Sequence, residues 1–122
     1  MSIKFSDRLL DELPDALIVA DLKGVIRVWN TRAEELFKFS KAAVIGESLD
    51  LIIPENLRKS HWAGFCRAIS SGKVKFNGKP VRTKALLGDG GLSYVNITFS
   101  LSHDEEGNTI GVAALARVAP KE

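Results

Sequence analysis

The sequence predicts a single domain of the α+β class, in which a mainly antiparallel sheet of five strands surrounds a helical middle section. The chain has 122 residues, 45% hydrophobic and 26% charged, as is typical of one globular domain. Helical periodicity is confined to the middle of the chain, whereas most flanking segments alternate with a period of two. No internal repeat or linker is evident, so the one predicted boundary separates an N-terminal helical segment, 1–13, from a domain over 14–122.

Composition excludes several classes of function. The formal net charge is only +2, and Lys and Arg are scattered among acids, so we expect no direct binding of nucleic acid. No stretch approaches the roughly 18 apolar residues of a membrane span, and the N-terminal residues lack a signal-peptide block. We therefore expect a cytoplasmic protein that does not bind membranes. Cys66 is the only cysteine, which excludes an intramolecular disulfide, and we expect its thiol to be buried.

The first predicted element is a short amphipathic helix over residues 6–13. Leu9, Leu10 and Leu13 lie on one side of it, charged residues lie on the other, and Pro14 ends it. Isolated helices below about 12–15 residues are marginal in water, so its apolar side needs a partner surface. We expect this segment to form a cap on the domain.

A hairpin and three short helical segments are predicted next. ALIVAD and GVIRVW are β-branched runs at residues 16–21 and 24–29, separated by a turn that ends at a glycine. Thr31 and Glu34 resemble a capping box, which predicts a helix beginning at Thr31. Further helical segments are expected over residues 40–45 and 49–53.

The longest predicted helix covers residues 55–71. Leu57, His61 and Phe65 recur at a spacing of four along one stripe, which is the helical period. Gly72 follows, and glycine accepts the left-handed conformation at a helix end. Trp62 lies beside the stripe, where we expect it to pack in the core rather than line a cofactor.

Three strands in hairpins complete the predicted fold. Residues 81–87 alternate with a period of two, and a DGG sequence at 89–91 favours a hairpin turn. In the next strand Val95, Ile97 and Phe99 point to one face, which we expect to be buried against the long helix. The last strand is TIGVAALARV.

This order of elements, together with the motifs LPDALIVAD, VWN, AEELF and IGES, resembles the PAS family over nearly the whole chain. The resemblance implies the PAS fold, an α+β fold with one long helix across one face of the sheet. It also implies a sensory domain without enzymatic activity, whose output partner is a histidine kinase or a transcription regulator. The sequence agrees, because it has no nucleophile elbow and no phosphate-binding GxxxxGK.

Within the PAS family, the segment IIPENLRKSH is similar to heme-binding domains of rhizobial oxygen-sensing histidine kinases. There, a histidine seven residues after a proline is the axial ligand of heme iron, and that position is His61. An arginine near a heme propionate corresponds to Arg67. The oxygen-responsive arginine of that group corresponds to Val81, which departs from the pattern, and we expect Arg82 on the opposite face. The resemblance implies a heme b cofactor.

The residues alone leave the role of His61 open. An imidazole on an apolar stripe must be satisfied by a hydrogen bond or bound to a ligand, so it is a heme ligand, a structural histidine or a contact for another small molecule. PAS domains resemble a cupped hand, so we expect any cofactor between the long helix and the inner sheet face. The predicted cofactor-binding residues are Ile53, Leu57, His61, Phe65, Arg67, Val81, Ile97 and Phe99.

A hypothesis from a different class is a domain without cofactor that serves dimerisation or protein docking. We expect Trp29, Tyr94 and Leu115 on the outer face of the sheet, where a helix or a second subunit covers them. PAS relatives commonly pair through the N-terminal element, so the resemblance favours a homodimer. Its predicted interface consists of Leu9, Leu10, Leu13 and Trp29.

Overall fold

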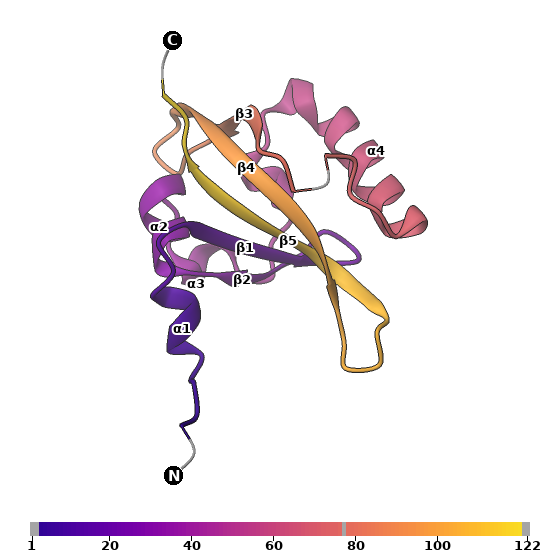
Figure 1. The fold of residues 1–122 in the computed structure, drawn as a ribbon. Coiled ribbons are helices and arrows are strands. Elements are labelled where there is room, and N and C mark those ends of the chain that lie inside the picture. The colour runs from indigo at the N-terminus through magenta and orange to yellow at the C-terminus, as the bar shows by residue number, and fades with distance from the viewer. Residues whose placement is uncertain (1–2, 77, 121–122) are drawn as a thin grey trace.

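A single five-stranded antiparallel sheet forms the centre of the molecule, which confirms the predicted α+β class (Figure 1). The computed structural model describes residues 3–76 and 78–120, so the outermost residues of the two predicted segments lie outside the described part. The strand order is β2-β1-β5-β4-β3, which places β5 in the middle, paired with β1 and β4. The strands are β1 (Ala16–Asp21), β2 (Ile26–Trp29), β3 (Val81–Leu86), β4 (Leu92–His103) and β5 (Thr109–Val118).

The helices lie between β2 and β3, except for the first. The long helix α4 ends where the sequence predicts, because Gly72 adopts a left-handed conformation with φ of 72°. Figure 1 shows α4 to one side of the sheet, whereas α2 and α3 lie near β1 and β2. The helices are α1 (Arg8–Asp11), α2 (Thr31–Phe37), α3 (Lys41–Val44), the 3-10 helix η1 (Leu49–Ile52) and α4 (Glu55–Ser71).

The N-terminal helix is shorter than the predicted segment 6–13. Only residues Arg8–Asp11 are helical, and none of them is buried. Helices of this length gain most of their stability from packing, and here Leu9 and Leu10 remain exposed. The helix projects away from the sheet in Figure 1, so within one chain it does not fold back onto the outer sheet face.

The prediction that Trp29 lies on the outer sheet face is wrong. Trp29 is 1% exposed, and its ring centroid lies 5.4 Å from that of Phe37. Its indole nitrogen donates to the carbonyl oxygen of Phe39 at 3.1 Å. Trp29 pairs with Ile18 across β1 and β2, and directly opposed residues of an antiparallel pair share a face. Because Ile18 is buried in the core, Trp29 is too, and it cannot contribute to a dimer interface.

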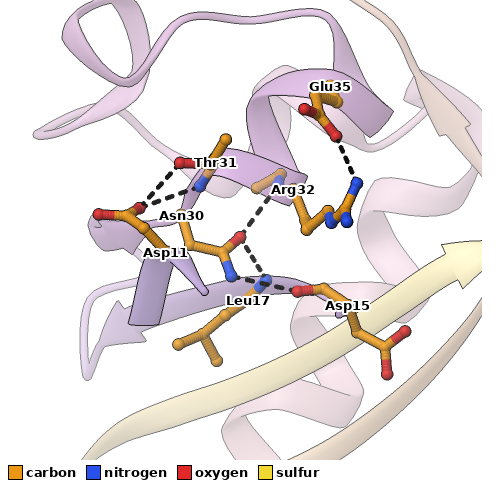
Figure 2. A network of polar contacts seen from close by, with 8 residues as sticks. Asp11, Asp15, Leu17, Asn30, Thr31, Arg32 and Glu35 are labelled. Carbon is orange, nitrogen blue, oxygen red and sulfur yellow. Dashed lines mark hydrogen bonds and ion pairs between the residues drawn. The ribbon is translucent and has the colours of Figure 1, made fainter. Parts of the chain in front are cut away.

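A second correction concerns the start of α2, where Asn30 rather than Thr31 is the capping residue. The side-chain oxygen of Asn30 accepts hydrogen bonds from the backbone nitrogens of Ala33 at 3.0 Å and Leu17 at 2.9 Å. Its amide nitrogen donates to the carbonyl oxygens of Leu10 at 2.7 Å and Asp15 at 3.1 Å. Asn30 is 2% exposed, and Figure 2 shows its amide between α2, β1 and the preceding chain. One side chain therefore joins α1, β1 and α2.

Thr31 has a smaller role than the capping-box motif implies. Its hydroxyl and its backbone nitrogen both donate to a carboxylate oxygen of Asp11, at 3.2 and 3.1 Å, and this contact is exposed (Figure 2). It ties the end of α1 to the start of α2.

Candidate ligand-binding cavity

A cavity of about 750 Å³ lies between α4 and the inner face of the sheet. Ligand sites for small molecules are typically ~300–1,000 Å³ and mostly apolar. The interior of this cavity fits that description, because it is lined by buried apolar side chains from β1, β4 and α2, among them Ile18, Val95 and Phe37. The inner face of the sheet and the apolar stripe of α4 therefore do not pack directly against each other along their whole length.

The eight residues predicted for a cofactor site all line this one cavity. Leu57, His61 and Phe65 come from α4, while Val81, Ile97 and Phe99 come from β3 and β4. Val95 and Ile97 are buried as expected, and Phe99 is half-buried. Ile53 follows η1, and Arg67 completes the set from the second half of α4.

Among the described residues, His61 is the one whose side chain has a buried nitrogen or oxygen atom without a hydrogen-bond partner. That atom is Nδ1. Its ring packs against Trp62 and Phe65, with centroid distances of 4.7 and 6.0 Å. Burial lowers the pKa of His61 below its usual value of 6.5, although the negative charge of Asp50 opposes the shift. The imidazole is therefore neutral at pH 7, which is the form that ligates metals.

Trp62 packs in the core, as predicted, and it holds α4 in place through contacts that the sequence did not reveal. Its indole nitrogen donates to a carboxylate oxygen of Asp50 at 2.8 Å. Its six-membered ring lies directly against Gly24, in the turn between β1 and β2, where a Cβ atom would overlap it. Gly24 has φ of 77°, so both its backbone and its surroundings require glycine. Asp50 and Gly24 lie 12 and 38 positions before Trp62 in the sequence, and no local pattern predicts these contacts.

The strand β3 places Val81 and Arg82 on opposite faces, as predicted. Val81 lines the cavity, whereas the Arg82 guanidinium lies 4.0 Å from the centroid of the Tyr94 ring. Arg82 also donates to the carbonyl oxygen of Pro120 at 3.3 Å. Its cation therefore belongs to the outer face and is not available to a ligand in the cavity.

The thiol of Cys66 is exposed, which contradicts the expectation that it is buried. Cys66 follows Phe65, and consecutive residues of a helix are rotated by about 100° around its axis. Because Phe65 points inward from α4, its neighbour is turned away from the core. Cys66 is not among the residues that line the cavity.

Comparison with known proteins agrees with this fold. A family model described as the PAS fold matches residues 4–119. The sensor protein FixL of Bradyrhizobium diazoefficiens is 40% identical over 53 residues, which cover 43% of this chain and 10% of that protein. An uncharacterized protein of Azorhizobium caulinodans is 34% identical over 91 residues, covering 74% of this chain and 12% of that protein. A solved PAS domain of a Colwellia psychrerythraea protein superposes with a TM-score of 0.79, at 20% identity and 92% coverage of both chains.

The α+β fold with its cavity, together with the family model that matches it, identifies this chain as a sensory domain of the PAS class. The chain belongs to the PAS family, with distant homology to FixL. It spans only about a tenth of the length of the two curated relatives. Among the described residues, no helix has the length and apolar character needed to cross a membrane.

Proposed function

We propose that this PAS domain senses a small molecule that binds in the cavity between α4 and the sheet, and that heme b, ligated by His61, is the best single candidate. The observation that carries the proposal is the cavity itself, which is lined mostly by apolar side chains and has the side chain of His61 in its wall. A mostly apolar cavity with few polar groups in its wall is typical of small-molecule sites, and the imidazole offers a ligand one polar contact there.

The residues present fit a heme group. His61 is neutral near pH 7 and lines the cavity, so it is suited to bind the iron, and Arg67, which also lines the cavity, is our candidate to contact a propionate. A bound heme would supply an iron centre that binds diatomic gases. The distant homology to FixL, which is named a sensor protein, supports this choice.

We propose that the domain is not an enzyme and acts by passing its ligand state to another domain or protein. Among the described residues that line the cavity, no carboxylate or thiol accompanies His61, so an acid and base pair is not assembled there. The chain covers a small part of its curated relatives, which leaves room in such proteins for an output domain. We propose an output of the histidine kinase or transcription regulator type.

Titration with hemin tests the heme proposal. We expect the wild-type protein to give an intense, shifted Soret band at one heme per chain, because the imidazole nitrogen ligates the iron. The variant His61→Ala should lose that shift and bind hemin at least about tenfold more weakly, equivalent to about 1.4 kcal/mol. The variant His103→Ala is the matched control, because His103 is exposed at the end of β4. An unchanged spectrum in His61→Ala would exclude His61 as the ligand.

A second candidate function, dimerisation through the N-terminal segment, is favoured by a separate observation. Ile3, Phe5, Leu9 and Leu10 are 82%, 83%, 48% and 36% exposed, although all four are apolar. Leu13 is half-buried, and Leu115 on the outer sheet face is 40% exposed. We propose that a second copy of the chain covers these side chains in a two-fold dimer, since clusters of exposed apolar residues mark interaction sites.

Light scattering at micromolar concentration tests the dimer. We expect a mass twice that of one chain for the wild type and a mass of one chain for Leu9→Glu, because a carboxylate cannot be buried in an apolar interface without a partner. The control is Leu22→Glu, which changes an equally exposed leucine, 48%, in the turn after β1. A wild-type protein with the mass of one chain would contradict the dimer and leave the ligand proposal intact.

A further inference from the structure

The cavity has an apolar interior but positively charged residues where it meets solvent. Arg67, Lys73 and Lys75 line it and are exposed, so they mark its mouth. The described lining contains no Asp or Glu. The chain as a whole carries 15 acidic residues against 17 Lys and Arg, so this one-sided charge does not follow from composition.

The three cations at the mouth are available to a ligand. None of them forms an ion pair within residues 3–76 and 78–120. The ammonium group of Lys75 lies 5.4 Å from the ring centroid of Phe76, which also lines the cavity. Lys84 is different, because its ammonium group lies near the Tyr94 ring on the outer face, 5.4 Å from the centroid, and so does not belong to the mouth.

Cations beyond the end of a helix also stabilise its dipole, and Lys73 follows the C-terminus of α4. That role accounts for Lys73 alone. Arg67 lies a full turn before the end of the helix, and the last turn of α4 contains no basic residue. The helix dipole also does not explain why β3, β4 and β5 contribute no Asp or Glu to the cavity lining.

We propose that the cavity takes an amphipathic carboxylic acid, with its apolar body inside and its carboxylate held at the mouth by Arg67, Lys73 and Lys75. The apolar body gains from leaving water, and the carboxylate gains charge-assisted hydrogen bonds. This inference rests on the proposed function and defines its ligand class. A porphyrin with propionate side chains and a fatty acid share this chemistry.

Paired acids and esters test the inference. The pairs are dodecanoate with methyl dodecanoate, and iron-free protoporphyrin IX with its dimethyl ester. Binding is followed by tryptophan fluorescence, to which Trp62, in contact with His61, contributes together with Trp29. Without iron, ligation by His61 does not contribute. We expect at least one acid to bind about tenfold more tightly than its ester, because only the acid has a carboxylate that forms charge-assisted contacts with the partly exposed cations. The pair that shows the preference identifies the ligand source.

Two triple variants locate the charge effect. In Arg67→Gln, Lys73→Gln, Lys75→Gln the preference for the acid should fall to less than about threefold, since the ester never used these charges. The control Lys23→Gln, Lys41→Gln, Lys59→Gln removes as many exposed cations outside the cavity and should keep the full preference.

Each other outcome has a distinct meaning. Equal binding of acid and ester, or a preference that persists in the mouth variant, overturns the inference and leaves the proposed ligand site standing. Binding by none of the four compounds also overturns it. If hemin fails to bind as well, the proposed function itself is contradicted.

Discussion

The variant Asn30→Ala is expected to lower the free energy of unfolding by about 2–4 kcal/mol, the largest loss that we predict for a single side chain. The substitution leaves the backbone nitrogens of Leu17 and Ala33 without their acceptor and removes the donor to Leu10 and Asp15. Asn30 is 2% exposed, so water does not easily replace these partners. Urea denaturation followed by circular dichroism measures the loss.

Two further variants separate capping from burial at this position. Asn30→Asp keeps both acceptor contacts but cannot donate to Leu10 and Asp15, so we expect a large loss again. Thr31→Ala removes only an exposed hydroxyl contact with Asp11 and should cost less than about 1 kcal/mol. Equal effects of Asn30→Ala and Thr31→Ala would show that the buried amide does not organise the junction of α1, β1 and α2.

The variant Gly24→Ala is expected to destabilise the protein by about 2–3 kcal/mol and to weaken ligand binding. A non-glycine residue at φ of 77° costs about 1–2 kcal/mol, and its Cβ atom would overlap the Trp62 ring. Because Trp62 also donates to Asp50, its displacement should shift α4 and, with it, the neighbouring residue His61. Thermal unfolding and hemin titration measure the two effects.

Gly46 offers a matched control, since its φ is 89° and a Cβ atom there would meet no heavy atom within 4 Å. Gly46→Ala should show the backbone cost and no change in ligand binding. The double variant Gly24→Ala, Trp62→Ala should be less destabilised than the sum of its single variants, because the smaller side chain removes the overlap. Additive effects would mean that Gly24 and Trp62 are not coupled.

Local patterns predicted the elements of this fold, because each depends on residues close in sequence. The bounds of α4 follow from its periodicity and from Gly72, and the strands follow from alternation and from the glycine turns. Trp29 was misplaced because alternation along a short edge strand does not say which face is covered. That depends on α2, which returns to pack beside β1, and on the pairing of Trp29 with Ile18.

The site was predictable in part. The helical stripe and the PAS resemblance identified the residues that line the cavity, including His61. Three features were missed, namely the amide of Asn30, the contact of Trp62 with Gly24 and the cations of Lys73 and Lys75. The first two join segments that only the tertiary fold brings together. Lys73 and Lys75 lie in the connection between α4 and β3, where no periodic pattern marks them.

The measurement that tests the central claim most directly is ligand binding to a variant whose cavity is filled. Gly64 lies on the stripe of α4 that lines the cavity, and a Cβ atom there would meet no heavy atom within 4 Å. Gly64→Leu therefore adds a side chain at the cavity wall whose Cβ atom has free space, and it replaces a residue that weakens helices by about 0.5–1 kcal/mol relative to alanine.

We expect Gly64→Leu to unfold at the same temperature as wild type or higher, and to bind hemin or dodecanoate at least about tenfold more weakly, a difference of about 1.4 kcal/mol. Gly64→Ala, which adds a single methyl group, should retain most of the binding. If folded Gly64→Leu binds these compounds as tightly as the wild type, the cavity between α4 and the sheet is not the ligand site.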